Sequence, residues 1–278
     1  MTKRIDTALF DAVKQLTQSE SAKLDAELLL GFVLGRSRTY LFTWPEKQLT
    51  QDELAQFDAL IAKRVLGHPV AHLIGEREFW GLSLEVSPAT LIPRPDTELL
   101  VEFALSRLEN ITSPKVLDLG TGTGAIALAI ASERADANVL GVDFSEGAVA
   151  LAKRNQSKLA LHNASFVKSN WFSAVSGLYD LIVSNPPYID EDDPHLTQGD
   201  VRFEPASALV APSQGLADIE HIASLAAQYL NDGGILAVEH GYQQAQAVQE
   251  VFLRYDWKQV NTLKDLGNNE RVTYGVKG

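Results

Sequence analysis

Apolar residues recur every three or four positions through most of the first quarter of the chain. Ile5, Leu9 and Leu16 fall on one face of a helix at this spacing, and the spacing returns within residues 24–32 and 54–65. Short polar stretches separate these segments. The pattern therefore predicts a bundle of four or five short helices at the start of the chain.

The helical spacing then stops and a different pattern follows. Residues 78–86 alternate around Gly81 and favour a β-hairpin. Residues 88–98 contain three prolines and are therefore a poor candidate for regular structure. A helix is expected over residues 97–108, with an aspartate near its N-cap.

From residue 115 onward, short apolar runs alternate with helical patterns. The predicted strands are residues 115–120, 138–143, 165–169, 179–184, 233–240, 257–265 and 271–277. The predicted helices between them are residues 125–135, 145–159, 219–230 and 243–255. Strands joined by helices lie parallel, with helices on both faces of the sheet. The chain therefore predicts an α/β fold with a doubly wound, mostly parallel seven-stranded sheet, divided into a helical domain (1–75), a hairpin linker (76–96) and an α/β domain (97–278).

The charge balance narrows the possible functions. The 278 residues include 24 Lys and Arg and 36 Asp and Glu, which gives a formal net charge of −12. A protein that binds the phosphate backbone of nucleic acid is normally basic, so we expect no stable binding of nucleic acid. The excess negative charge lies wholly after residue 75, because the first 75 residues are balanced. This split indicates two units with different roles.

Cysteine and membrane signals are both missing from the sequence. With no cysteine, the chain cannot form disulfides, a thiolate nucleophile or a cysteine-ligated zinc site, and we predict no metal. No uncharged run approaches the roughly 18 residues of a membrane-spanning helix, and the N-terminus does not resemble a signal peptide. We therefore expect a soluble, cytoplasmic protein with no membrane partner.

A glycine-rich sequence, DLGTGTG, joins the first predicted strand of the sheet to the helix after it. Its three glycines let the backbone approach a ligand closely, and ligands bind at this end of the strands in open α/β sheets. Gly120, Gly122 and Ala125 also match the spacing of dinucleotide sites. A tight turn that binds nothing is the competing interpretation.

Asp143 ends the second predicted strand, nineteen residues after Gly124. A carboxylate at this position can accept hydrogen bonds from both hydroxyls of a ribose. Such a site suits NAD and the adenosyl part of S-adenosylmethionine equally well, and a plain helix cap is the structural alternative. The two motifs therefore predict a nucleoside site without choosing the nucleoside.

The sequence Asn185-Pro186-Pro187-Tyr188 directly follows the fourth predicted strand. The two prolines remove two backbone donors and stiffen the chain, so nearby carbonyls are free to accept hydrogen bonds from a ligand. Asn185 can accept as well, and Tyr188 offers an aromatic face to a flat group. Two acceptors that hold both N–H bonds of a planar amide or amine would aim its lone pair at a methyl donor. The motif therefore predicts methylation of such a nitrogen.

DLGTGTG, Asp143 and NPPY together resemble the class I S-adenosylmethionine-dependent methyltransferases that modify amide or exocyclic amino nitrogens. Four further segments narrow the resemblance: TLIPRPDTE (90–98), SNWF (169–172), SNPPYID (184–190) and GDVRFEPASAL (199–209). They are similar to the protein-(glutamine) methyltransferases of the PrmC/HemK family, over nearly the whole chain. The resemblance implies a Rossmann-like methyltransferase domain that follows a helical substrate-recognition domain.

The resemblance also implies an activity and a set of site residues. Members of this family methylate the side-chain amide (N5) of the glutamine in the Gly-Gly-Gln motif of class 1 peptide-chain release factors, using S-adenosylmethionine and leaving S-adenosylhomocysteine. The residues that would wrap the methionine end of the cofactor are Gly120, Thr121, Gly122, Thr123 and Gly124. Asp143 would hold the ribose, Trp171 would lie against the adenine, and Asn185 would face both cofactor and substrate. NPPY would clamp the glutamine amide, and Asn170 departs from the Asp that the family usually has.

Three alternatives differ from this interpretation. The DNA methyltransferases of the adenine amino group (N6) use the same NPPY chemistry, but acidic residues 190–193 would repel phosphates at the mouth of the site. A solvated loop explains these residues as well. An NAD-dependent dehydrogenase would need a hydride-handling site that NPPY does not provide, and a binding module would not need these motifs intact. The residues whose roles stay open are Arg94, Glu98, His195 and His240.

Overall fold

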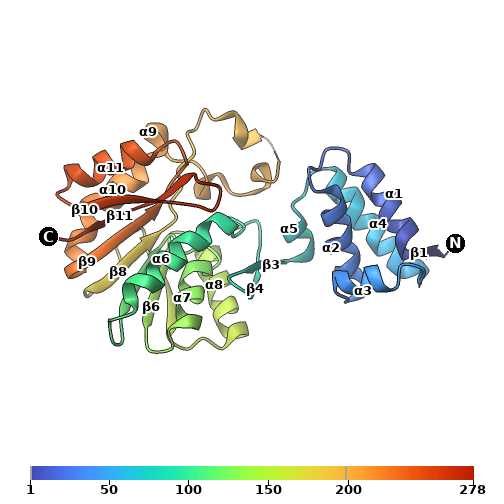
Figure 1. The fold of residues 1–278 in the computed structure, drawn as a ribbon, viewed down its shortest axis with the longest axis horizontal. Helices are drawn as coiled ribbons and strands as arrows, with labels where there is room; N and C mark the ends of the chain where they lie inside the picture. Colours follow the sequence, from blue (N-terminus) through green and yellow to red (C-terminus); the bar gives the residue numbers. More distant parts are fainter. Residues whose placement is uncertain (1, 198) are drawn as a thin grey trace. The chain divides into compact units, whose positions relative to one another are not determined.

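The computed structural model describes residues 2–197 and 199–278. The chain forms two compact units (Figure 1). The helical unit consists of Met1–Glu76 and Thr197–Phe203, and the α/β unit consists of Arg77–Leu196 and Glu204–Gly278. The polypeptide therefore passes from one unit to the other three times.

The helical unit is a small bundle, as the apolar spacing predicts. Its helices are α1 (Ile5–Gln15), α2 (Ala22–Leu34), α3 (Arg38–Thr43), α4 (Gln51–Val65) and α5 (Val70–Ile74). Two short strands, β1 (Lys3–Arg4) before α1 and β2 (Gln48–Leu49) between α3 and α4, pair antiparallel. Helix α4 begins with a capping box, in which Thr50 accepts from the Glu53 N–H while the Glu53 carboxylate accepts from the Thr50 N–H. The core of the unit includes Leu29, Leu30 and Phe57, all fully buried.

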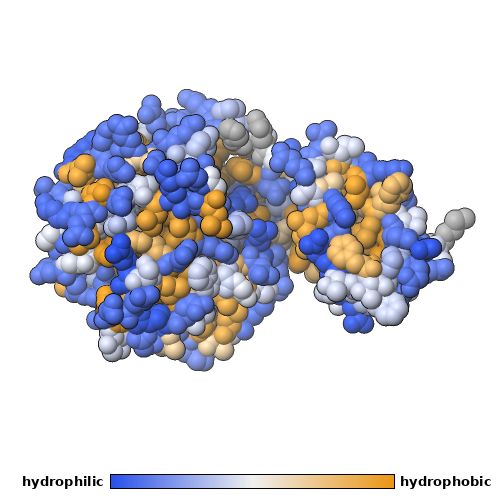
Figure 2. Space-filling model, viewed as in Figure 1, coloured by the Kyte–Doolittle hydropathy of each residue, from blue (hydrophilic) through white to orange (hydrophobic). Residues whose placement is uncertain are grey.

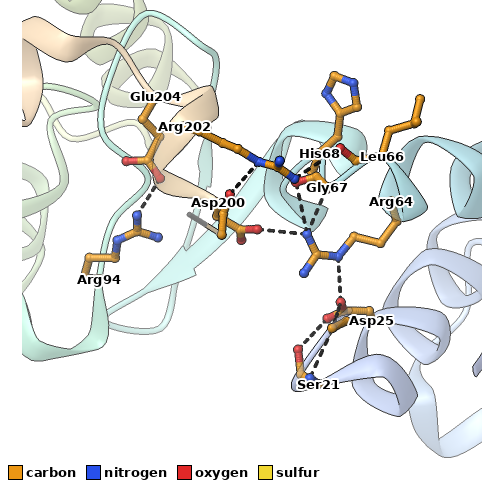
Figure 3. Close-up of polar contacts among 12 residues, drawn as sticks. Ser21, Asp25, Arg64, Leu66, Gly67, His68, Arg94, Asp200, Arg202 and Glu204 are labelled. Atoms are coloured by element: carbon orange, nitrogen blue, oxygen red, sulfur yellow. Dashed lines mark hydrogen bonds and ion pairs between the residues drawn. The ribbon is translucent and has the colours of Figure 1, made fainter. Parts of the chain in front are cut away.

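The helical unit includes a second segment, residues 197–203, which a cluster of polar residues around Arg64 binds (Figure 3). Nε of Arg64 donates to Asp25 (2.7 Å), and Nη1 of Arg64 donates to Asp200 (2.8 Å). Arg202 donates to the carbonyl of Leu66 at 3.2 Å. Residues 197–203 therefore belong to the helical unit by contact, although 120 residues of the α/β unit precede them.

Replacement of Arg64 by alanine should destabilise the helical unit. It would leave two carboxylates, one of them buried, without their cation, so we expect a loss of about 3 kcal/mol in the free energy of unfolding. Urea denaturation of the purified variant measures this loss. Lys63→Ala, at the exposed neighbouring position of α4, is the matched control and should change stability by less than about 0.5 kcal/mol. Equal stabilities for the two variants would contradict this prediction.

The segment between the helical bundle and the large sheet is a hairpin, as expected. Its strands are β3 (Glu76–Phe79) and β4 (Leu82–Glu85). Trp80 and Gly81 form the turn, and both have positive φ (54° and 70°), as a two-residue hairpin loop requires. The proline-rich stretch then leads through a 3-10 turn, η1 (Pro95–Thr97), into helix α6 (Glu98–Leu108).

The α/β unit is built on a seven-stranded sheet, which confirms the predicted fold class. Its strands are β5 (Lys115–Leu119), β6 (Asn138–Asp143), β7 (Ala164–Lys168), β8 (Tyr179–Ser184), β9 (Leu230–Glu239), β10 (Lys258–Lys264) and β11 (Glu270–Val276). Their order is β10-β11-β9-β8-β5-β6-β7. Strands β5 to β9 pair in parallel, and β11 pairs antiparallel with both β9 and β10.

Helices cover both faces of this sheet. They are α6, α7 (Ala125–Glu133), α8 (Glu146–Leu159), α9 (Pro212–Gly215), α10 (Ala217–Leu225) and α11 (Ala245–Arg254). Two separate apolar clusters result, one that includes residues of α6, α7 and α8 and one that includes residues of α10 and α11. The doubly wound arrangement therefore places the carboxyl ends of β5, β6 and β8 at one edge, where α/β sheets bind ligands.

Most boundaries agree with the sequence prediction within two residues, and two differ by three or more. The helix expected over residues 219–230 ends at Leu225, and a 3-10 turn, η5 (Ala226–Tyr229), follows it. Strand β9 then begins at Leu230, three residues earlier than predicted, because the chain pairs with Tyr179 of β8 already at that point. No helix in the described ranges is long and apolar enough to cross a membrane.

Candidate cofactor and catalytic site

A cavity of about 350 Å³ lies in the α/β unit at the carboxyl ends of β5, β6 and β8. The predicted site residues that line it are Gly120, Thr121, Gly122, Thr123, Asp143, Trp171, Asn185 and Pro187. Gly124, Pro186 and Tyr188 are not among the described residues of its wall. The fold therefore brings the glycine loop, the acidic residue after β6 and the NPPY corner to one place, although more than 60 residues separate the first from the last.

The glycine loop turns tightly between β5 and α7. Gly120 and Gly122 have φ of +71° and +56°, values that favour glycine. The N–H groups of Gly120 and Thr121 both donate to the carbonyl of Val142 at 2.9 Å, which fixes the loop to the end of β6. A Cβ at Gly120 would lie 3.6 Å from the ring of Trp171, so the absence of a side chain keeps this part of the cavity open.

Gly124 has a different role from the other two glycines. Its φ is +83°, and a Cβ there would lie 3.0 to 3.2 Å from Phe166, Leu128 and Ala152. These neighbours belong to the apolar core beneath the loop. Gly124 therefore allows α7 to pack closely on the sheet, and its predicted contact with a cofactor stays a prediction.

Asp143 braces the loop as well as facing the cavity. Its Oδ2 accepts from the N–H of Gly122 (2.9 Å), and its Oδ1 accepts from the N–H of Ser145 (2.8 Å). Burial raises the pKa of this carboxyl, and the two backbone hydrogen bonds act in the opposite direction. Each carboxylate oxygen can accept a second hydrogen bond, so Asp143 can still bind a diol.

Asp118, to which the sequence motifs assign no role, is completely buried near the end of β5. Its Oδ2 accepts from the Thr121 hydroxyl at 2.6 Å, so it supports the glycine loop from below. Burial raises its pKa to about 7, and the negative charge of Asp143 adds to this, against hydrogen bonds from Thr121 and Ala127 that lower it. The one sequence signal for a role of Asp118 is its position as the first residue of the DLGTGTG motif.

The raised pKa of Asp118 predicts a pH-dependent stability. Because the folded state holds this proton more tightly than the unfolded state, the contribution of Asp118 to stability falls as the pH rises from the ordinary aspartate value to about 7. Asp118→Asn removes the titration. We expect the stability of this variant relative to wild type to improve by at least about 1 kcal/mol from pH 5 to pH 8.

Urea denaturation at the two pH values measures this change. Asp192→Asn, at an exposed position, is the control and should show no such shift. The prediction fails if the free energy of unfolding of Asp118→Asn differs from that of wild type by the same amount at pH 5 and at pH 8.

The Ser169–Phe172 segment after β7 forms another part of the cavity wall. Trp171 has a positive φ of 47°, and its carbonyl accepts from the Ser169 hydroxyl at 2.6 Å. Asn170 also lines the cavity, so the residue that departs from the family's usual Asp lies within the site. Its side-chain oxygen can accept from an amino group, as an aspartate would.

The NPPY corner is fixed to the glycine loop and to η1. The hydroxyl of Ser184, the last residue of β8, donates to the carbonyl of Leu119 at 2.8 Å. Nδ2 of Asn185 donates to Oγ1 of Thr97 at 3.1 Å. This bond occupies the donor side of the amide, so Oδ1 of Asn185 is the atom left to accept from a ligand.

Tyr188 lies behind this corner. It packs against the apolar cluster that covers one face of the sheet, and its hydroxyl points to Oε1 of Glu239 at 3.4 Å. Burial and the nearby Glu239 charge raise the pKa of this phenol. Contact between its ring and a flat substrate group stays a prediction.

The structure places three of the four residues whose roles the sequence left open. Arg94 lines the cavity and donates to the buried carboxylate of Glu204 at 2.5 Å (Figure 3). Glu98 accepts from the N–H of Trp80, so it holds the hairpin. His240 is buried, and its ring bonds the Gly241 carbonyl and Thr273. The side chain of His195 lies outside the described part of the structure.

Comparison with known proteins agrees with the motifs. Residues 7–75 match the PrmC N-terminal domain, and residues 96–209 match the methyltransferase small domain. The release factor glutamine methyltransferase of Escherichia coli (strain K12) is 55% identical over 268 residues, which cover 96% of each chain. That of Vibrio cholerae is 51% identical over 279 residues, which cover 99% of this chain and 97% of the relative.

A solved structure supports the fold. The 16S rRNA N2 G1207 methyltransferase of T. thermophilus, in complex with AdoMet and guanosine, aligns with a TM-score of 0.54 at 22% identity. The alignment covers 73% of this chain and 50% of that one. Since the full-length relatives are more than half identical to it, the chain belongs to the family that its motifs resemble, the release factor glutamine methyltransferases.

Proposed function

We propose that this enzyme methylates the side-chain amide nitrogen (N5) of the glutamine in the Gly-Gly-Gln motif of class 1 peptide-chain release factors. The position of Asn185 carries the proposal, because Asn185 lines the same cavity as the glycine loop and its Nδ2 is held by Thr97, which leaves Oδ1 as the acceptor. The names of the relatives that match the whole chain support the choice of a release factor as substrate. Because such a substrate acts in translation, we also propose that the enzyme acts in the cytoplasm.

The cavity suits S-adenosylmethionine as the methyl donor. Asp143 offers acceptors for the ribose, the loop at Gly120 and Gly122 leaves room for the methionine part, and Trp171 offers an aromatic face for the adenine. When bound, this group supplies a methyl on a positively charged sulfur, which is already a strong electrophile. The chain therefore needs to supply orientation more than activation.

The NPPY corner performs that orientation in our proposal. Oδ1 of Asn185 and a backbone carbonyl of the proline corner accept the two N–H bonds of the glutamine amide. The amide nitrogen then directs its electron pair to the methyl carbon, and the carbon–sulfur bond breaks as the carbon–nitrogen bond forms. The donor, when bound, would keep the electrons of the broken carbon–sulfur bond on its sulfur, and the methylated amide would lose one proton. The two acceptors also stabilise the positive charge that develops on the nitrogen.

DNA adenine methylation remains the alternative substrate class. The residues after NPPY disfavour it, because Glu191 and Asp192 are exposed acids in a chain of net charge −12. Such a surface repels phosphates and favours basic groups on a protein partner. The acidic loop therefore supports a protein substrate.

We also propose that residues 1–75 recognise the protein substrate, with residues 76–96 as the link to a methyltransferase domain of residues 97–278. The helical unit exposes large apolar side chains on its surface (Figure 2), among them Phe10, Phe32 and Phe42, which are 59%, 50% and 55% exposed. Exposed aromatic residues of this kind are enriched where proteins bind one another.

Methyl transfer from labelled cofactor tests the proposed function. The purified enzyme is incubated with a class 1 release factor, with the same release factor carrying Ala in place of the Gln of its Gly-Gly-Gln motif, or with duplex DNA. We expect one methyl group on that glutamine by peptide mass spectrometry, and none on the variant factor or on DNA. Label on adenine, or on another residue of the release factor, would overturn the proposal.

A further inference from the structure

We propose that Arg94, held in place by Glu204, binds the carboxylate at the amino-acid end of S-adenosylmethionine, and that the hydroxyl of Thr90 donates a further hydrogen bond to that carboxylate. This inference rests on the proposed function, in which S-adenosylmethionine occupies the cavity. Both Thr90 and Arg94 belong to the segment between the hairpin and η1, which borders the cavity.

The charges of the cavity wall indicate where an anionic group can bind. Among the described residues of the wall, Asp143 and Asp218 are acids and Arg94 is the one cation. A carboxylate that enters this cavity loses part of its hydration and meets two side chains of its own charge. Its transfer from water is therefore unfavourable unless a cation compensates the charge, and Arg94 is the side chain of this wall that can do so.

Arg94 is fixed by its backbone and by a buried acid. Pro93 and Pro95 flank it and restrict the backbone on both sides. Nη2 of Arg94 donates to Oε1 of Glu204 at 2.5 Å (Figure 3). The Glu204 side chain is 0% exposed, so its charge is stable only next to a cation. This requirement holds the guanidinium in position before any ligand binds, which lowers the entropy cost of binding.

The pair with Glu204 leaves most of the guanidinium available to a ligand. Arginine has five N–H donors, and among the described residues only Glu204 accepts from Arg94. The side chain of Arg94 is 33% exposed, so a ligand in the cavity can reach it, although it cannot reach Glu204. A guanidinium binds a carboxylate through two parallel N–H bonds. Arg94 therefore has both the charge and the free donors for such a group.

Thr90 gives an independent indication of a ligand. It lines the cavity and is 2% exposed, and its Oγ1 is buried without a hydrogen-bond partner in the part of the chain that the structure describes. Buried hydroxyls without a partner are rare, because they lose their hydrogen bonds to water and gain none. A Cβ at Gly122 would lie 3.9 Å from that of Thr90. The hydroxyl is therefore beside the loop that we assign to the methionine part of the cofactor.

Two ligands that differ only in the carboxylate test this proposal. S-Adenosylmethionine and decarboxylated S-adenosylmethionine are titrated into the cofactor-free enzyme by calorimetry, so the measurement does not depend on methyl transfer. For Arg94→Gln we expect the Kd of S-adenosylmethionine to rise about 10- to 100-fold, because a charge-assisted pair is lost. The Kd of the decarboxylated ligand should stay within about threefold of wild type, because that ligand has no carboxylate for Arg94 to bind.

A double variant keeps the test decisive if Arg94→Gln does not fold. Arg94→Gln combined with Glu204→Gln leaves no buried carboxylate without a cation, and it should show the same selective loss of affinity. Arg154→Gln is the matched control, since Arg154 pairs with Glu85 at 3.0 Å in the same unit and is not among the described residues of the cavity wall. It removes the same charge and should keep the wild-type Kd for both ligands.

Thr90→Val separates ligand binding from a structural role. Valine has the shape of threonine, and the hydroxyl that it replaces has no partner in the cofactor-free enzyme. The melting temperature of that form should therefore not fall, while the Kd of S-adenosylmethionine should rise about 3- to 10-fold. A merely structural hydroxyl would give a lower melting temperature and an unchanged Kd. Thr90→Ser should restore the wild-type Kd.

The outcomes distinguish this inference from the proposed function. An Arg94→Gln variant that loses equal affinity for both ligands, or for neither, would overturn the carboxylate assignment. A raised KM for the release factor with unchanged cofactor Kd would overturn it as well and assign Arg94 to the protein substrate. A Thr90→Val loss that persists with the decarboxylated ligand would overturn the role of Thr90. Wild-type enzyme that binds S-adenosylmethionine but does not methylate the release factor would contradict only the proposed function.

Discussion

Replacement of Asn185 by alanine should lower kcat about 10³-fold while cofactor affinity changes by less than about threefold. The asparagine supplies one of the two acceptors that hold the substrate amide in our proposal, and its donor side is already bound to Thr97. Without Oδ1, the substrate nitrogen keeps one free N–H and samples orientations in which its electron pair misses the methyl carbon. Single-turnover methylation of a release factor, with cofactor Kd from calorimetry, measures both quantities.

Asn138→Ala is a suitable control for this variant, because Asn138 is exposed at the start of β6. It should retain wild-type turnover. An Asn185→Ala enzyme with normal kcat would show that the NPPY corner does not hold the reacting nitrogen. A normal kcat with a much weaker cofactor Kd would instead assign Asn185 to cofactor binding alone.

The second large effect is expected at Asp143, where alanine should weaken cofactor binding about 100-fold. Two losses combine in this variant: the acceptors for the ribose hydroxyls, and the hydrogen bond that holds the N–H of Gly122 at 2.9 Å. At saturating cofactor, kcat should recover to within about tenfold of wild type, because the NPPY corner is intact. Calorimetric titration and the cofactor dependence of the methylation rate provide the two measurements.

Asp143→Asn separates those two losses. The asparagine oxygen can still accept from one N–H of the loop, so the loop should stay closer to its native shape while the diol loses one acceptor. We expect an affinity between those of wild type and Asp143→Ala. Unchanged Kd in both variants would contradict the assignment of Asp143 to the ribose.

The sequence predicts the fold of the α/β unit well, because its signals are local. Apolar runs of five or six residues and helices at regular spacing identify the strands, and their alternation dictates a parallel sheet. The motifs likewise place the glycine loop, Asp143 and Asn185 at carboxyl ends of strands, which meet in space whatever their separation along the chain. The boundary between α10 and β9 was missed because pairing of Leu230 with β8 overrides local helix propensity.

Other features depend on contacts that no local pattern encodes. Thr97 and Asn185 lie 88 positions apart and meet only through the fold, so Thr97 does not stand out in the sequence. Gly124 shares its motif with Gly120 and Gly122, yet its neighbours are core side chains instead of the cavity. Attachment of residues 197–203 to the helical unit requires Arg64 and Asp200, which carry no signal of their own.

That attachment has a consequence for exchanging parts between relatives. A chimera that takes only residues 1–76 from a homologue would combine a foreign Arg64 environment with the resident Asp200 and Arg202. The transplanted bundle would lack the 197–203 segment of its own chain, which its polar cluster binds. A workable swap must therefore carry residues 197–203 together with residues 1–76. The helical unit is thus encoded by two separate parts of the gene.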